Sequence, residues 1–525
     1  MSINSAAFLL FLAIAVALYY LAPKQWRYLV LLAASAFFYL SYSVKAAIYL
    51  LFTIAVTYGA AMGLGAMHRT ERAAAGIQGA DTAAVRRIWL RRRRLVLAGV
   101  LVLNFATLAL FKYLDSWLWT ANSVLNLVGL SFQFRPLELL LPLGISFYIF
   151  QTSGYLIDVY RGKTEPERHF LKYALFVSYF PQMIQGPINR FGALQSQLIE
   201  GNGFSADQLK YGIQLMLWGM LKKLLIADTL AAAVTEVFNH FTQYSGAVIL
   251  LAVILYCLQL YCDFSGGTDL VRGASQLFGV EMMENFRRPY FAHTVDDFWR
   301  RWHISLGEWM KDYLFYPLAL SKPLNRLSKK LRPVIGVRLG KLVVPCISTV
   351  VVFLMVGVWQ GPGLSNIAYG LWNGGLMSLA ILTAPAAVKV RERLKITDRT
   401  RWFHVFQVVR TFLLVVVGRY FSRAGQLLQA LRMLKRTVFN FGLGSLSPGM
   451  LTSFGLDPLH WGVVLISAAV LIAVSAFQER GVPIRKTLET RHWAIQFAVL
   501  FVGVLVVYVF LSGSYTPIGY VYENI

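Results

Sequence analysis

Long apolar runs, separated by short polar or basic segments, recur from one end of this 525-residue chain to the other. A bilayer core about 30 Å thick is crossed by about 20 mainly apolar residues in a helix, so these runs predict transmembrane helices. The first run has no basic segment before it and no small-residue cleavage site, which indicates a retained helix and not a signal peptide. The runs interpreted as spans outside residues 169–279 are Ala6–Leu21, Tyr28–Leu40, Ala46–Met67, Leu95–Phe111, Leu139–Tyr160, Leu342–Trp359, Leu364–Ala384, Phe403–Val417, Trp461–Phe477 and Trp493–Leu511.

The stretch His169–Gly279 is less regular, because it holds three apolar runs where the alternation of sides needs two crossings. One run is therefore expected to be re-entrant or broken, either at Lys222–Lys223 or at "DFSGGTD". The sequence predicts an all-α polytopic membrane protein of about 12 transmembrane helices, with additional interfacial and re-entrant helices. We expect a single integral membrane domain over 1–525, with N-terminal helices over 1–138 and C-terminal helices over 403–525.

The distribution of charged residues predicts on which side of the membrane each polar segment lies. The chain is 57% hydrophobic and 14% charged, and its net charge of +25 could by itself suggest nucleic-acid binding. However, the basic residues concentrate in short segments between apolar runs, at Arg86–Leu95, Lys322–Lys341 and Lys389–Arg401. Such segments stay in the cytoplasm and can touch anionic lipids, so we expect membrane lipids and no nucleic acid as partners, and both termini outside. Arg419–Arg436 breaks this charge rule, and we interpret it as an amphipathic surface helix.

Polar side chains cluster in five of the otherwise apolar regions. One such residue alone is better explained by a bond to a neighbouring helix, but five clusters with helix-breaking Gly and Pro favour a common protein-enclosed interior. Three cysteines lie without metal-site spacing, so we expect buried thiols and no metal site. The clusters are "LPLGISFYIFQTSGYLIDVYRG" (Leu141–Gly162), "YFPQMIQGPINRF" (Tyr179–Phe191), "LQLYCDFSGGTDLVRG" (Leu258–Gly273), "ENFRRPYFAHTVDDFWRRWHISLGEWMKDYLFYPL" (Glu284–Leu318) and "GVWQGPGLSNIAYGLWNG" (Gly357–Gly374).

Three polar residues of these clusters have distinct expected depths. Asn373 lies twelve residues before Pro385, which at 1.5 Å per residue places it about 18 Å from the cytoplasmic end, near mid-bilayer. Gln360 is expected at the turn of a helical hairpin. His303 belongs to a tryptophan-rich segment too charged to span, so it is expected along the cytoplasmic interface. A snorkelling surface histidine is the alternative interpretation of His303.

Together these segments resemble the membrane-bound O-acyltransferase (MBOAT) family, and within it the bacterial branch of alginate O-acetyltransferase and the D-alanyl transfer protein of teichoic acid synthesis. The resemblance extends from Met1 to about Gly444 and is strongest over 139–385. It implies a ring of helices around a funnel, in a bacterial cell membrane. It also implies a cytoplasmic acyl-thioester donor (acetyl-CoA or an acyl carrier protein) used as substrate, with no tightly bound cofactor, and an extracytoplasmic glycan-modifying partner protein.

The resemblance also locates the departures of this chain. Family members usually have a catalytic histidine where this chain has Gln360, and many have a second histidine where it has Asn373, whereas the motif ending in His303 is intact. An amide can donate and accept hydrogen bonds but cannot take a proton near pH 7. We therefore expect His303 and Gln360 as catalytic residues, and the expected substrate-binding residues are Asn373, Gln151, Gln182, Gln185, Asp263, Ser265, Trp302 and Trp359.

Two functions stay open from the sequence. One is an active O-acyltransferase that moves an acyl group, chiefly acetyl, from the thioester to a hydroxyl of an exported or cell-surface polysaccharide. In that case Gln360 and Asn373 orient the reactants, and His303 or a relayed water acts as base, because losing one base slows a reaction without forbidding it. The other is a catalytically impaired relative that binds or passes acyl groups, or scaffolds a polymer-modifying complex.

Overall fold

The computed structural model describes residues 3–77, 81–137, 139, 141–397, 400–512 and 519–520. The chain ends Met1 and Ile525, predicted outside the cell, lie beyond these residues. Within the described ranges the backbone is almost entirely helical, and its one β-type pairing is an isolated antiparallel bridge between Phe286 and Trp302. Two compact units are distinguished: residues 3–216 with 271–283, and residues 217–270 with 284–520.

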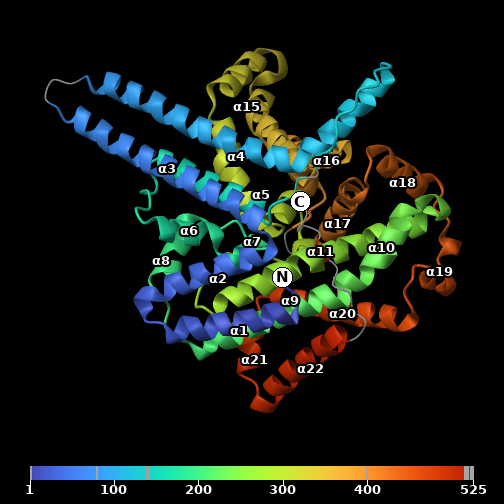
Figure 1. The fold of residues 1–525 in the computed structure, drawn as a ribbon. Helices are drawn as coiled ribbons and strands as arrows, with labels where there is room; N and C mark the ends of the chain where they lie inside the picture. The colour runs from blue at the N-terminus through green and yellow to red at the C-terminus, as the bar shows by residue number, and fades with distance from the viewer. Residues whose placement is uncertain are drawn as a thin grey trace. The chain divides into compact units, whose positions relative to one another are not determined.

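The first unit is built from the N-terminal helices. Its two longest helices, α3 and α4, lie side by side over most of their length (Figure 1). Side chains cap the N-termini of both helices. Ser43 accepts a hydrogen bond from Ala46 N at the start of α3, and Asp81 accepts from Ala83 N and Ala84 N at the start of α4. These bonds satisfy main-chain N–H groups that have no partner within the helix. The elements are α1 Ala6–Leu21, η1 Lys24–Trp26, α2 Arg27–Tyr42, α3 Val44–Ala75, α4 Thr82–Leu127, α5 Ile145–Tyr160, α6 Phe170–Ser178, α7 Phe180–Met183 and α8 Phe191–Ile199, with part of α9 Ala206–Leu221.

The second unit holds the remaining elements and part of α9, and α11 also contributes residues to both units. They are the π-helical η2 Lys222–Asp228, α10 Thr229–Asn239, η3 Phe241–Gln243, α11 Gly246–Gln276, η4 Pro289–Phe291, α12 Val295–Arg301, α13 Ile304–Met310, the π-helical η5 Lys311–Phe315, α14 Tyr316–Ala319, α15 Lys322–Gln360, α16 Leu364–Arg393, α17 Arg401–Arg423, α18 Leu427–Phe439, η6 Leu443–Ser445, α19 Pro448–Thr452, α20 Pro458–Glu479, α21 Ile484–Glu489 and α22 Trp493–Ser512.

Eight helices in the described part of the chain are long and apolar enough to cross a membrane: α3, α4, α11, α15, α16, α17, α20 and α22. Seven of them match spans predicted from the apolar runs, and α11 lies in the stretch 169–279, for which two crossings were predicted without assigned bounds. The other four of the roughly 12 expected crossings fall on α1, α2, α5 and the α9–η2–α10 run, whose α-helices have 16 residues or fewer. The chain is therefore a polytopic helical membrane protein.

The break predicted between residues 169 and 279 is found neither at Lys222–Lys223 nor at "DFSGGTD", because helix continues from α9 through η2 into α10 and the only irregularity there is the π-helical turn. The π-helix η2 begins at Lys222, whereas α11 runs through residues 263–269 without a break. The first glycine of "DFSGGTD", Gly266, has a packing role instead. A Cβ on Gly266 would lie 2.8 Å from the main-chain oxygen of Gly219, so Gly266 is needed for the close approach of α11 to α9.

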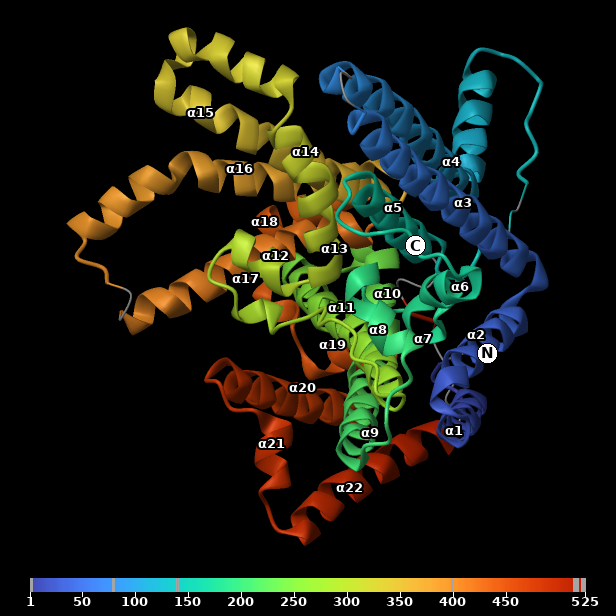
Figure 2. The ribbon, with the colours of Figure 1, turned by 90° about the vertical axis from the view of Figure 1, so that its left-hand side faces the viewer.

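The predicted basic loop Lys322–Lys341 is helical. It forms the first part of α15, which folds back on itself at Gly336, where φ is +84° (Figure 2). The Ser328 hydroxyl donates to the Gly340 main-chain oxygen at 2.7 Å and ties the two arms together. Arg86–Leu95 likewise continues α4 as helix. Basic composition does not interrupt the helices here, because Lys and Arg are good helix formers.

The helical hairpin of α15 and α16 confirms the predicted turn after Gln360. Glycines let the two backbones touch: a Cβ added at Gly357 would lie 2.4 Å from the Asn366 main-chain oxygen, and one added at Gly370 would lie 2.4 Å from that of Phe353. Small residues commonly allow membrane helices to approach this closely. The hairpin therefore fixes the spacing between Gln360 at its turn and Asn373 along α16.

The amphipathic surface helix predicted for Arg419–Arg436 is shorter than expected. Residues 419–423 end α17, and the amphipathic helix is α18, Leu427–Phe439. Arg419 is fully buried, with its guanidinium 4.6 Å from the centre of the Trp302 ring. The prediction was wrong for this residue because a guanidinium can be buried against aromatic faces, which a charge count does not reveal.

Candidate active site

His303 lies between the short helices α12 and α13 and is 2% exposed. Its backbone is left-handed, with φ +47°, a conformation that costs an ordinary residue about 1–2 kcal/mol. Main-chain bonds from Arg287 N to Arg301 O and from Ile304 N to Asn285 O hold the chain on both sides of it. His303 is therefore a residue placed inside the protein, and the alternative of a surface histidine is excluded.

Two aromatic rings and one amide surround the His303 imidazole. The Phe264 ring of α11 meets it edge-on with centroids 4.8 Å apart, and the Trp359 ring of α15 lies at 5.8 Å. The Asn285 Oδ1 atom is 3.2 Å from His303 Nδ1. Burial lowers the pKa of His303 to about 3. The imidazole is therefore neutral near pH 7, with one nitrogen able to accept a proton or a hydrogen bond.

Asn285 is a site residue that the sequence analysis did not single out. It is fully buried, and its Oδ1 also accepts bonds from Ser305 N at 3.1 Å and from the Ser305 hydroxyl at 2.9 Å. An amide at the start of the charged, tryptophan-rich segment that leads to His303 was the available signal. Nothing in the spacing of 18 residues indicates that the two side chains meet, because the contact depends on the Phe286–Trp302 bridge.

Gln360 and Asn373 occupy different surroundings. Gln360 is the last residue of α15 and is half-buried, directly after Trp359, whose ring contacts His303. Asn373 is buried, accepts a bond from the Trp299 indole at 3.1 Å and donates to the Tyr369 main-chain oxygen at 2.8 Å. The structure thus places Trp359, the residue before Gln360, in contact with His303. Asn373 instead bonds Trp299 of α12, which precedes His303 by four residues.

Asp263, Ser265 and their neighbours form a buried ion network. The Lys223 ammonium donates to Asp263 Oδ1 at 2.6 Å and lies 2.9 Å from Asp228 Oδ1. The Lys222 ammonium donates to Asp269 Oδ2 at 2.7 Å and to the Ser265 hydroxyl at 2.9 Å. Asp263 and Ser265, predicted to bind substrate, are therefore placed in contact with two lysines that cancel much of the local charge.

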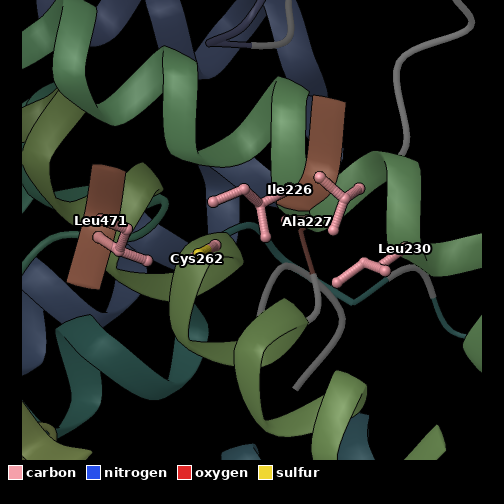
Figure 3. Packing of buried hydrophobic residues seen from close by; sticks show 6 residues of the cluster. Ile226, Ala227, Leu230, Cys262 and Leu471 are labelled. Atoms are coloured by element: carbon pink, nitrogen blue, oxygen red, sulfur yellow. The ribbon is translucent and has the colours of Figure 1, made fainter. Parts of the chain in front are cut away.

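The π-helical geometry of η2 supports this network. In a π-helix the hydrogen bonds join residues five apart, which brings Lys223 and Asp228 to one side of the helix. Residues of η2, α10, α11 and α20 form a buried apolar cluster, which is shown in Figure 3. Its members are Ile226, Ala227, Leu230, Cys262, Val464 and Leu471.

Trp302 is a core residue of the second unit. Its ring stacks on Phe298 at 5.6 Å and packs edge-on against Phe286 at 5.1 Å, and the Arg419 guanidinium covers another side. Such contacts keep the chain before His303 rigid. Trp302 was predicted to bind substrate, and the contacts described here are with the protein itself.

The predicted glutamines of the first unit are buried near the end of α6. The side-chain nitrogens of Gln151 and Gln182 both donate to the Phe176 main-chain oxygen, and Gln182 Oε1 accepts from Asn189 at 3.4 Å. Gln185 is fully buried in the same segment. Gln151 and Gln182 therefore converge on one carbonyl within this unit. A common substrate funnel for all predicted residues stays a prediction.

Comparison with known proteins places this chain among acyltransferases. A model of the membrane-bound O-acyltransferase (MBOAT) family matches residues 164–332, which include Lys223, Asp263, Asn285 and His303. The chain is 34% identical over 472 residues to the probable alginate O-acetylase AlgI of Pseudomonas aeruginosa, covering 90% of this chain and 81% of that protein.

Two further relatives have other named acceptors. The peptidoglycan O-acetyltransferase of Helicobacter pylori is 31% identical over 449 residues, covering 80% of this chain and 74% of its own length. The teichoic acid D-alanyltransferase of Bacillus subtilis is 27% identical over 287 residues, which cover 54% of this chain and 69% of that protein. Since the similarity to the Pseudomonas protein extends over nearly the whole chain, this polytopic protein belongs to the MBOAT family.

Proposed function

We propose that the protein moves an acyl group, chiefly acetyl, from a cytoplasmic thioester to a hydroxyl of an exported or cell-surface polysaccharide. The observation that carries this proposal is the similarity, over nearly the whole chain, to an alginate O-acetylase, with a further similarity to a peptidoglycan O-acetyltransferase. Acetyl-CoA or an acyl carrier protein would supply the donor as a substrate, and an extracytoplasmic glycan-modifying protein is the proposed partner.

The proposed chemistry uses the neutral His303. The hydroxyl oxygen of the acceptor attacks the thioester carbonyl carbon, and its proton passes to the imidazole nitrogen, directly or through one water. As the C–S bond breaks, the imidazolium gives this proton to the leaving thiolate. The products are an ester and a thiol, and the imidazole is neutral again. General-base help of this kind contributes about 10²–10⁴-fold, and positioning of an already activated thioester contributes further. Gln360, beside Trp359, would donate a hydrogen bond that orients one reactant.

Substitution at His303 and Gln360 tests this proposal. His303→Ala should reduce acyl transfer to the polymer by at least about 10²-fold. Gln360→Ala should impair it less, through loss of one orienting hydrogen bond, and Gln360→His should raise the rate by adding a base beside Trp359. Transfer would be measured with labelled thioester donor and exported polymer. Wild-type rates in both alanine variants would refute the catalytic assignment.

A second candidate function rests on the amide at Gln360, where the resemblance to the MBOAT family implies a catalytic histidine. Under it the protein binds or passes acyl groups, or scaffolds a polymer-modifying complex. This function is favoured if wild type transfers no acyl group from any thioester donor while Gln360→His creates the activity.

The proposed orientation has the N-terminus outside a bacterial inner membrane, with Arg86–Arg94 and Lys322–Lys341 in the cytoplasm. The support is their basic composition, since such segments are retained inside. Single cysteines introduced into either segment should stay unlabelled by an impermeant thiol reagent in intact cells and react after permeabilisation. Labelling from outside would reverse the orientation.

A further inference from the structure

We propose that Asn285 is a positioning residue that fixes the tautomer of His303, so that Nδ1 carries the hydrogen and Nε2 carries the lone pair. This inference rests on the proposed function, in which His303 takes a proton from the acceptor hydroxyl. It assigns which of the two imidazole nitrogens faces the reactants and which group holds it there.

The first step identifies the amide atom that faces the histidine. Ser305 N is a main-chain N–H and can only donate, and it lies 3.1 Å from the Asn285 side-chain atom in question. That atom must therefore be the amide oxygen and cannot be the nitrogen. The Ser305 hydroxyl at 2.9 Å from the same atom agrees with this assignment.

The second step assigns the proton of the imidazole. His303 Nδ1 lies 3.2 Å from the same amide oxygen, which has no hydrogen to give. A hydrogen bond at this position therefore requires Nδ1 to donate. In a neutral imidazole the other nitrogen, Nε2, is then the acceptor. The bond made by one nitrogen thus sets the chemical role of the other, as it does in histidines oriented by a partner group.

The third step concerns how firmly the pair is held. The main chain of Asn285 accepts from Ile304 N at 3.0 Å, so both its backbone and its side chain bind the segment that carries His303. Phe264 and Trp359 pack against the imidazole from other elements. Because Asn285 is fully buried, solvent does not compete for its oxygen. The ring is therefore held in one orientation before a substrate arrives.

The identity of the partner matters as much as its position. An amide oxygen accepts the Nδ1 hydrogen without adding a charge, whereas a carboxylate there would stabilise the imidazolium and raise the pKa of the histidine. Asn285 therefore orients His303 while leaving it neutral. The Asn285 side-chain nitrogen has no hydrogen-bond partner among the described residues, so replacing it by a second oxygen removes no bond.

Nitrogen NMR of histidine-labelled protein tests the tautomer independently of activity. The chain has eight histidines, and the His303 signals are those lost in His303→Ala. We expect wild type to show a protonated Nδ1 and an unprotonated Nε2 at neutral pH. The opposite tautomer, or an even mixture, would overturn the inference whether or not the protein transfers acyl groups.

Three variants connect the tautomer to the reaction. Asn285→Leu removes the acceptor, and we expect a mixed tautomer and a fall in acyl transfer of about 10–100-fold, the range typical of lost orienting partners. Asn285→Asp keeps an oxygen at the same place, so Nδ1 should stay protonated, and its carboxylate should raise the pKa of His303. The matched control is Ser305→Ala, which removes one donor to the same oxygen but leaves the Ser305 N–H bond and the bond to Nδ1 in place, so the Nδ1–H tautomer should be retained.

The outcomes separate this inference from the function on which it rests. If His303→Ala loses transfer while Asn285→Leu keeps both the tautomer and the rate, the inference fails and the proposed function stands. If His303→Ala leaves transfer unchanged, the proposed role of His303 fails, and the wild-type spectrum still decides the tautomer. If Ser305→Ala changes the tautomer and the rate as Asn285→Leu does, the conformation of the segment around His303, and not the Asn285 amide, determines the tautomer. The inference is then wrong. Should Asn285→Leu not fold, the wild-type spectrum and Asn285→Asp decide.

Discussion

Two buried polar clusters of the second unit meet at consecutive residues of α11. One consists of ion pairs, and the other consists of neutral groups. Phe264 contacts the neutral cluster of His303 and Asn285, while Asp263 and Ser265 on either side of it bind Lys223 and Lys222. In the ion network, charged groups bind one another. At His303 the described partners are an amide and aromatic rings, which leave the imidazole neutral. The comparison predicts that removing one charge from the ion network is costly to stability, whereas the neutral cluster leaves an imidazole able to accept a proton.

The largest expected effect is on the charged cluster. Lys223→Met would leave the carboxylates of Asp263 and Asp228 buried without their shared cation, so it should lower the free energy of unfolding by about 3–5 kcal/mol. Lys222→Met should cost less, because its partner Asp269 keeps 18% of its side chain exposed and can be hydrated. Thermal unfolding in detergent measures both. An equal loss of unfolding free energy in the two variants would show that the difference in burial between the two ion pairs does not set their contribution.

An intermediate effect is expected from acid pH on the neutral cluster. Burial lowers the pKa of His303 to about 3, so the folded protein leaves the imidazole unprotonated at pH 5, whereas the unfolded chain takes up the proton below about 6.5. This contribution to stability is complete above pH 6.5 and is lost as the pH falls. At pH 5 wild type should have lost about 2 kcal/mol more than His303→Gln, relative to pH 7.5.

Melting temperatures of the two proteins at both pH values give this difference. A wild type and a His303→Gln variant with the same loss on acidification would show that the imidazole is not held neutral by burial.

The smallest effect is expected at the neutral contact between α12 and α16. Asn373→Leu removes the acceptor of the Trp299 indole N–H and should lower the free energy of unfolding by about 1–2 kcal/mol. Asn373→Asp keeps an acceptor oxygen there and serves as control. If both variants are as stable as wild type, the bond contributes orientation and not stability, and only acyl transfer would respond.

The sequence predicted the long apolar helices because hydrophobic length is a local property. It did not distinguish a glycine that breaks a helix from one that packs it: Gly266 lies inside α11 against Gly219, whereas Gly336 reverses α15. The difference depends on which helix lies opposite, and that is a property of the tertiary fold.

The same limit applies to the candidate site. His303 and Trp359, both singled out from the motifs, do meet. Asp263 and Ser265 could be identified as buried polar groups, but their lysine partners come from another helix, and Asn285 reaches His303 through a β-bridge of two single residues. Residue type predicted that these groups lie inside the protein. Which of them pair with one another was decided by packing.

The π-helix η2 shows that the number of residues in a segment can matter as much as their identity. Lys223 and Asp228 are five residues apart, and in an α-helix the side chains that face each other are three or four apart. The wider turn of η2 takes up one surplus residue within the segment, so the helix on either side continues and the two charges still meet at 2.9 Å. A one-residue difference in length, and no special side chain, thus gives one lysine two carboxylate partners.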